Sequence, residues 1–152
     1  GPTTCLMNFA VLARGSVRSA VDSSILFDVL LPDPEFGETS AALLRWAIDS
    51  GVVVACEVVW AEVRASFPSD AAFNDAMTKL GIEFDPMTSD AAEMAGSLWR
   101  RYRSAKGSPR DHLIPDFLVG AHASLQAEVL LSRDRGFYRR YFTALKVHDS
   151  II

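Results

Sequence analysis

Four acidic residues could act together chemically although they lie far apart in the chain: Asp22, Glu62, Asp116 and Asp134. Each follows a strand-like apolar run or lies on an otherwise apolar helix. Carboxylates that converge at neutral pH repel one another unless a cation neutralises them. Their oxygen atoms suit a hard divalent ion such as Mg²⁺. A shared acidic site would therefore predict metal-dependent hydrolysis of a phosphodiester bond.

Each carboxylate also has a simpler explanation when it is taken alone. Asp22 and Asp134 precede predicted helices and could be N-caps, while Asp116 in a first helical turn would favour the helix dipole. Glu62 resists this explanation, because its predicted place on the apolar side of a helix would require a buried ion pair or unexpected exposure. Helix capping and site chemistry both remain open from these local patterns.

The elements that would position these residues alternate between strands and helices. Apolar runs predict strands at residues 19–22, 52–55, 82–84, 129–131 and 145–147. Helical periodicity and end signals predict helices at residues 24–31, 35–50, 57–66, 70–80, 88–105, 115–127 and 135–142. This alternation predicts an α/β fold, a three-layer α/β/α sandwich with a mainly parallel central sheet. Ligands in such folds bind beyond the carboxyl ends of the strands, where Asp22 and Asp134 would lie.

Length and composition indicate one globular domain. The chain has 152 residues, of which 49% are hydrophobic, enough for a single core. We expect the domain at residues 19–152, preceded by an N-terminal extension at residues 1–18 whose first two residues are typical of a scar left by tag removal. Two cysteines, Cys5 and Cys56, support neither a disulfide framework nor a zinc cluster. No apolar run approaches the roughly 18 residues of a membrane span, so we expect a soluble, cytoplasmic protein.

Four short motifs surround the acidic residues: AVDSSIL at residues 20–26, WAEV at 60–63, PDFLVGAHA at 115–123 and LLSRDRGF at 130–137. Their order and spacing resemble those of the PIN domains, ribonucleases best known as the VapC toxins of bacterial toxin–antitoxin pairs. The resemblance spans residues 20–147. It departs from the family in a longer segment before Val21 and in Ser132, where Thr is commoner, and neither departure touches the four carboxylates.

The resemblance implies a metal-dependent endoribonuclease. Asp22 and Asp116 would bind one or two Mg²⁺ or Mn²⁺ ions directly, and Glu62 and Asp134 would bind through water or orient the nucleophile. Ser24 and Ser132 would support these ligands through their hydroxyl groups. Membership of a toxin–antitoxin pair would further imply a cognate antitoxin and a homodimer. The apolar groove for that antitoxin would be sought around Leu30, Leu31, Trp46 and Trp60, which could equally be core residues.

The net charge of −4 hides an uneven distribution along the chain. Residues 100–152 contain ten basic and five acidic residues, whereas residues 1–99 contain five basic and fourteen acidic ones. Basic residues that could bind RNA phosphates flank Asp134, namely Arg133, Arg135, Arg139 and Arg140. A second group precedes Asp116 and could equally be a solvated helix face: Arg100, Arg101, Arg103, Lys106 and Arg110.

Aromatic and histidine residues give weaker signals. Four aromatic residues after Asp134 could stack on unpaired bases, or pack their short helix onto the sheet: Phe137, Tyr138, Tyr141 and Phe142. The three histidines show no metal-ligand spacing, so we expect structural or surface positions for His112, His122 and His148.

Two other functions remain as alternatives. A catalytically silent PIN-fold protein could bind RNA or a protein partner while keeping its carboxylates. A haloacid-dehalogenase-like phosphatase also has an Asp after its first strand, but it needs a second Asp two residues later, where this chain has Ser24. The phosphatase is therefore the weaker alternative.

Overall fold

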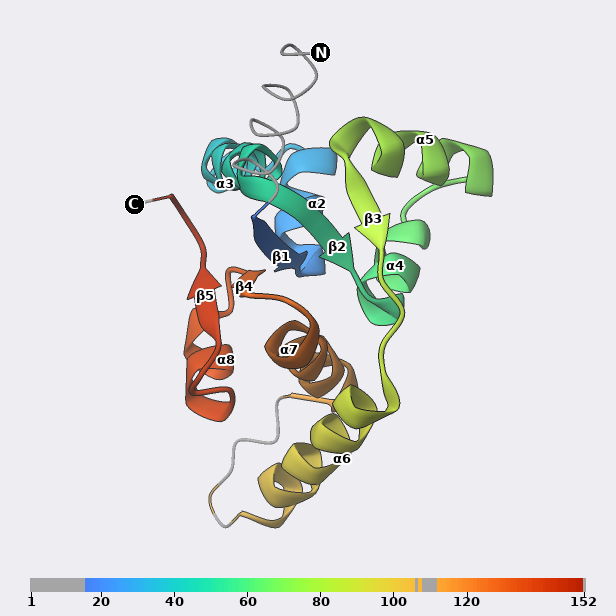
Figure 1. The fold of residues 1–152 in the computed structure, drawn as a ribbon. Coiled ribbons are helices and arrows are strands. Elements are labelled where there is room, and N and C mark those ends of the chain that lie inside the picture. The colour runs from blue at the N-terminus through green and yellow to red at the C-terminus, as the bar shows by residue number, and fades with distance from the viewer. Residues whose placement is uncertain (1–15, 106, 108–111, 152) are drawn as a thin grey trace, which may run out of the picture.

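The structure, a computed structural model, describes residues 16–105, 107 and 112–151. Five parallel strands in this part of the chain form one sheet in the order β3-β2-β1-β4-β5 (Figure 1). Their bounds are β1 Val17–Val21, β2 Gly51–Ala55, β3 Ile82–Phe84, β4 Val129–Leu131 and β5 Lys146–His148. All five predicted strands are present. However, β1 begins inside the predicted extension, of which residues 1–15 lie outside the described part.

Seven helices connect the described strands: α2 Ser23–Leu30, α3 Gly37–Ser50, α4 Glu57–Arg64, α5 Asp70–Leu80, α6 Ser89–Ser104, α7 Ile114–Gln126 and α8 Arg135–Tyr141. Crossovers between parallel strands are right-handed, and the chain reverses its direction across the sheet after β3. Helices α2–α5 and α6–α8 therefore cover opposite faces, which confirms the three-layer α/β/α fold. Figure 1 shows α6 and α7 packed side by side. No helix in the described residues is both long and apolar enough to cross a membrane.

The core lies along the three central strands. Val53 and Val54 of β2 and Leu130 and Leu131 of β4 are each at most 1% exposed. Burial of consecutive residues is expected where helices cover both faces of a parallel sheet. This is why the apolar runs of the sequence identified these strands so closely.

Two glycines fix the packing of helices at close quarters. Gly81 ends α5 with a φ of 75°, a left-handed conformation that glycine adopts without steric cost, as its predicted stop role requires. Gly120 on α7 faces the ring of Phe142, and a Cβ atom there would lie 2.3 Å from Phe142 Cε2. The absence of a side chain at residue 120 thus lets the segment after α8 pack against α7.

The carboxyl end of β1 continues directly into the candidate site. The backbone N–H of Asp22 donates to the carbonyl of Leu131 at 2.9 Å, and that of Ser132 donates to the carbonyl of His148 at 3.0 Å. Strand pairing therefore reaches one residue beyond β1 and β4. It holds Asp22 and Ser132 next to each other at the same edge of the sheet.

Candidate active site

The carboxylate of Asp22 accepts three hydrogen bonds at the carboxyl edge of the sheet. As the N-cap of α2, its Oδ1 accepts a hydrogen bond from the backbone N–H of Ser23 at 2.8 Å. Its Oδ2 accepts from the hydroxyl of Ser132 at 2.7 Å and from that of Ser24 at 3.3 Å. Asp22 is therefore a helix cap and also the centre of a hydroxyl network built by the two predicted supporting serines.

Asp116 and Asp134 lie at the starts of the two helices on either side of β4, namely α7 before it and α8 after it. An oxygen of Asp116, Oδ2, accepts from the backbone N–H of Leu113 at 3.2 Å in the first turn of α7. Asp134 is the N-cap of α8, but its side chain makes no capping hydrogen bond. Its backbone N–H instead donates to Ser132 Oγ at 3.0 Å, so this hydroxyl links the segments that carry Asp22 and Asp134.

Glu62 does not lie on the buried side of its helix, and that expectation was wrong. Val59 and Val63 of α4 are fully buried, whereas Glu62 is exposed. The hydroxyl of Ser23, at the start of α2, donates to Glu62 Oε2 at 3.3 Å. Glu62 thus faces the carboxyl edge of the sheet, where a polar side chain can remain in contact with water.

Asp22, Glu62 and Asp116 are close enough to affect one another electrostatically. Burial raises the pKa of Asp22 above 3.8, and the charge of Asp116 raises it further. Although Glu62 is exposed as a whole, partial burial of its carboxyl group raises its pKa above 4.5, with the charges of Asp22 and Asp116 acting in the same direction. Tyr138 is 1% exposed, and its pKa is raised by burial and then by all four carboxylates. The sheet therefore gathers the four predicted residues around one region.

The donor set fits a hard divalent cation by its chemistry. All four side chains offer oxygen atoms, and the pKa values of Asp22 and Glu62 are raised first by burial and further by neighbouring carboxylates, whose repulsion a cation would relieve. As the side chains stand, no three His, Cys, Asp or Glu residues of the described chain are grouped closely enough to hold one ion. Direct binding of one ion by three of these side chains would therefore require them to move closer together.

His112 contacts the candidate site, although the sequence indicated only a structural or surface position. Its Nε2 lies 2.9 Å from Asp134 Oδ2, and its ring stacks on Phe137 with centroids 3.9 Å apart and an interplanar angle of 4°. By contrast, His122 is 1% exposed and pairs with Asp85 at 2.8 Å, as expected of a structural histidine. No spacing in the sequence signalled the contact of His112 with Asp134.

The four arginines around Asp134 fall into two pairs. Arg133 makes an ion pair with Asp28, which is 2% exposed, and Arg135 makes one with Asp149 at 3.0 Å. Arg139 and Arg140 are exposed and have no carboxylate partner among the described residues. Of the second predicted basic group, Lys106 and Arg110 lie outside the described residues, while Arg100, Arg101 and Arg103 are exposed on α6.

Most of the aromatic residues after Asp134 pack the short helix α8 onto the protein. Phe137, Tyr138 and Phe142 are at most 6% exposed. Only Tyr141 is half-buried, and its ring contacts Tyr102 with centroids 5.5 Å apart. The Tyr141 ring also contacts Phe137 and Phe117, with centroids 5.2 and 5.8 Å apart, so Tyr141 is the least buried of the four but also helps to pack α8.

Comparison with known proteins identifies a family and a fold. Residues 20–143 match the model of the PIN domain family, as the four motifs predicted. The structure resembles VapBC2 of Rickettsia felis, solved with a DNA fragment from its promoter, with a TM-score of 0.65, 13% identity and coverage of 86% of this chain and 97% of that one.

Two further solved structures have the same fold. VapBC-1 of nontypeable Haemophilus influenzae gives a TM-score of 0.62 at 19% identity, covering 87% of this chain and 97% of that one. VapC20 of Mycobacterium tuberculosis, a toxin that cleaves the sarcin–ricin loop, gives 0.56 at 19%, covering 84% and 98%. No curated protein matches the sequence. At these identities the structural matches establish the fold alone.

Proposed function

The chain belongs to the PIN domain family, and from that premise we propose that it is a metal-dependent endoribonuclease that cleaves RNA phosphodiester bonds. One observation carries the proposal: the Ser132 hydroxyl donates to Asp22 and accepts from the backbone N–H of Asp134, while Ser23, next to Asp22, donates to Glu62, so hydrogen bonds link three of the four acidic segments at the carboxyl edge of the sheet. Ligands bind at this edge in parallel α/β folds. The same family match leaves the phosphatase alternative without support.

Within this site we assign Asp22 and Asp116 as direct ligands of Mg²⁺ or Mn²⁺. Glu62 and Asp134 would bind through water or orient the attacking water. A bound ion would polarise the scissile phosphate, lower the pKa of the attacking water and offset charge on the leaving oxygen. Ser24 and Ser132 hold Asp22 through their hydroxyl groups, so they act by fixing the orientation of a ligand.

We also propose that the chain is the toxin of a VapBC-type pair. Its fold resembles those of toxins solved with their antitoxins in Rickettsia felis and Haemophilus influenzae, which supports a cognate antitoxin as partner. We expect a homodimer as well. Of the candidate antitoxin contacts, Leu31 and Trp46 are 63% and 36% exposed. Trp60 packs against Phe73 and Phe84. It is therefore better suited to hold neighbouring side chains in place than to contact the antitoxin itself.

Cleavage of purified transfer and ribosomal RNA tests the proposed function. The antitoxin-free protein is incubated with Mg²⁺, with Mn²⁺ and with EDTA, beside Asp116→Asn and the control Asp49→Asn. Asp49 is exposed on α3, so its variant makes the same chemical change away from the site. We expect discrete fragments that require metal and disappear only in Asp116→Asn. Fragments that persist in Asp116→Asn would remove Asp116 from the site, and RNA binding without fragments would favour the catalytically silent alternative.

A further inference from the structure

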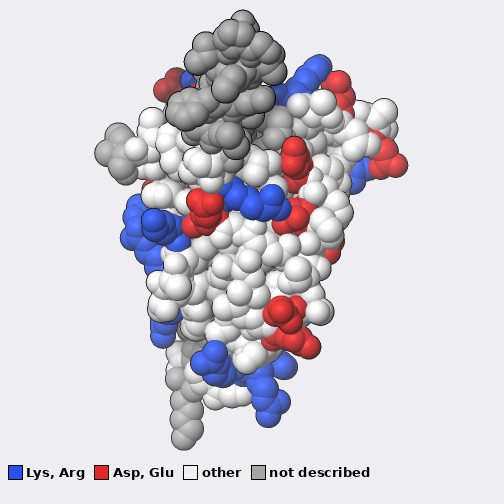
Figure 2. Space-filling view, viewed as in Figure 1, with Lys and Arg blue, Asp and Glu red and all other residues white. Residues whose placement is uncertain are grey.

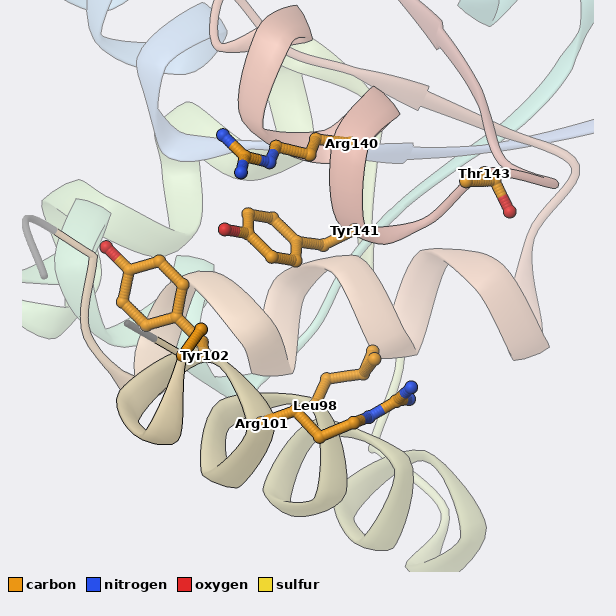
Figure 3. A pocket seen from close by; sticks show the side chains of 7 residues that line it. Leu98, Arg101, Tyr102, Arg140, Tyr141 and Thr143 are labelled. Carbon is orange, nitrogen blue, oxygen red and sulfur yellow. The ribbon is translucent and has the colours of Figure 1, made fainter. Parts of the chain in front are cut away.

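A cleft of about 480 Å³ opens between α6 and α8 on the face of the sheet that these helices cover. Leu98, Arg101 and Tyr102 line it from α6, and Arg140 and Tyr141 line it from α8 (Figure 3). The Tyr102 hydroxyl accepts from the backbone N–H of His112 at 3.2 Å. The cleft therefore adjoins the candidate active site at Tyr102.

The cleft leads to the candidate active site. A smaller adjoining cavity of about 160 Å³ shares Tyr102, Arg140 and Tyr141 with the cleft and is also lined by His112 and Asp134. One wall of aromatic rings therefore runs from a site carboxylate into the cleft. A chain-like ligand that lies across Asp134 could continue into this space without leaving the surface.

The charges in the cleft are opposite to those of the site. Arg101 and Arg140 are both exposed and form no ion pair within the described chain. In the view of Figure 3, the Tyr141 ring and the Leu98 side chain lie between the two guanidinium groups. Figure 2 shows acidic side chains over the start of α6 and basic ones over its later half. The positive charge is therefore concentrated at the end of α6 that borders the cleft.

We propose that this cleft binds the single-stranded RNA segment adjacent to the bond that is cut. Arg101 and Arg140 would each contact a phosphate, and the half-buried side chain of Tyr141, which lines the cleft, would contact a base. Cationic side chains combined with aromatic rings are the usual means of binding single strands. A cavity of this size accommodates single nucleotides rather than a duplex. This inference rests on the proposed function, because it concerns the substrate of the same site.

The arginines meet a specific electrostatic need. Four carboxylates repel an approaching RNA backbone, so the flanking phosphates need cations close to the site. Arg133 and Arg135 are engaged with Asp28 and Asp149, and a phosphate would have to compete with these carboxylates. Arg101 and Arg140 face no such competition within the described chain. They are therefore the better candidates for phosphate binding.

Binding of an uncleavable, unstructured 2′-O-methyl oligoribonucleotide tests the inference by fluorescence anisotropy over a range of salt concentrations. The proteins compared are the full chain, Arg101→Gln, Arg140→Gln and Arg45→Gln. Arg45 is exposed on α3, so its variant is matched in charge but lies on the other face of the sheet. Each cleft variant should weaken binding several-fold and reduce the slope of log K against log salt concentration by about 0.7 per lost phosphate contact. Arg45→Gln should bind as the unchanged protein does.

The outcomes separate this inference from the proposed function. If all three variants bind the oligonucleotide as tightly as the unchanged protein and with the same salt slope, the cleft is not the RNA-binding surface, even if the protein cleaves RNA. If binding depends on Arg101 and Arg140 but the protein cleaves no RNA, RNA binding by the cleft is supported and the proposed nuclease activity is overturned. A loss of binding in Arg45→Gln as large as in the cleft variants would also contradict RNA binding by the cleft, because it would show that only the overall charge matters.

Discussion

Two hydrogen bonds of 2.7 and 2.9 Å join the guanidinium group of Arg133 to the carboxylate of Asp28. Asp28 lies on α2 and is 2% exposed, and its Oδ2 also accepts from the hydroxyl of Ser40 at 2.7 Å. The guanidinium carbon of Arg133 lies 4.2 Å from the centre of the Phe36 ring. Arg133 therefore ties the turn before α8 to α2 and α3, so its first role is in the fold.

Replacement of Arg133 by Ala should destabilise the protein. It would leave the buried charge of Asp28 unpaired, a change that costs about 3–5 kcal/mol where both partners are buried. The side chain of Arg133 is 35% exposed, so we expect about 2 kcal/mol after allowing for solvent screening. Urea unfolding measures the cost, with Arg139→Ala as the exposed control. A loss no larger than that of the control would leave Arg133 available for RNA.

Ser132 should be necessary for efficient cleavage without being a ligand. Its hydroxyl donates to Asp22 and accepts from the backbone N–H of Asp134, so Ser132→Ala frees the orientation of both segments. Loss of such supporting contacts typically reduces metal affinity or activity by about 10–100-fold. Ser132→Thr keeps the hydroxyl and should restore most of the activity. Metal titration and kcat/KM on RNA provide the measurements, and full activity in Ser132→Ala would contradict the role.

The pH dependence of stability should reveal the strain on Asp22. Its pKa in the folded protein is raised above 3.8, first by burial and further by Asp116. The folded protein thus holds this proton more tightly than the unfolded chain does, and stability is lost as pH rises from about 4 through the raised pKa. In EDTA, Asp22→Asn should gain stability relative to the unchanged protein over this interval, and Mg²⁺ should narrow the difference at pH 7.

Urea unfolding at several pH values, with and without Mg²⁺, measures this difference. Asp49→Asn is the control, because Asp49 is exposed and its replacement should give a difference that is nearly constant with pH. A constant difference for Asp22→Asn as well would mean that Asp22 acts as an ordinary helix cap in the metal-free protein.

Two helical glycines should respond in opposite directions to replacement by Ala. At Gly120 the new Cβ would meet Phe142 Cε2 at 2.3 Å, whereas nothing lies within 4 Å of a Cβ at Gly96 on α6. Gly120→Ala should cost about 1–3 kcal/mol through overpacking. Gly96→Ala should stabilise the protein by about 0.5–1 kcal/mol, because Ala favours the helix. Thermal unfolding of the two variants checks both signs, and stabilisation by Gly120→Ala would show that Phe142 moves aside freely.

The sequence predicted the strands well because these strands are buried on both faces. Continuous apolar runs such as VVVA and VLL carry a strong signal when helices cover both sides of a sheet. The ends of the strands were predicted less well where hydrogen bonding to a neighbouring strand determines them. Strand β1 begins at Val17 because Val17 pairs with Gly51, and no local pattern encodes that register.

The sequence predicted the site residues that lie in local motifs. It did not predict those that are brought to the site by contacts between distant parts of the chain. Asp22, Asp116 and Asp134 lie near strand ends or helix starts that the sequence indicated. His112 meets Asp134 across 22 positions, and Arg133 meets Asp28 across 105, so neither contact has a local signature. The exposure of Glu62 depends on where α4 lies at the edge of the sheet, which helical periodicity alone does not determine.

The hydrogen bond between Ser132 and Asp22 spans 110 positions of the chain. It joins the residue after β1 to the residue after β4. Strand β1 remains without its neighbour β4 until nearly the whole domain has been synthesised. Contacts of such long range form late and slowly in folding. A growing chain therefore carries an incomplete site until residues 129–134 have emerged from the ribosome.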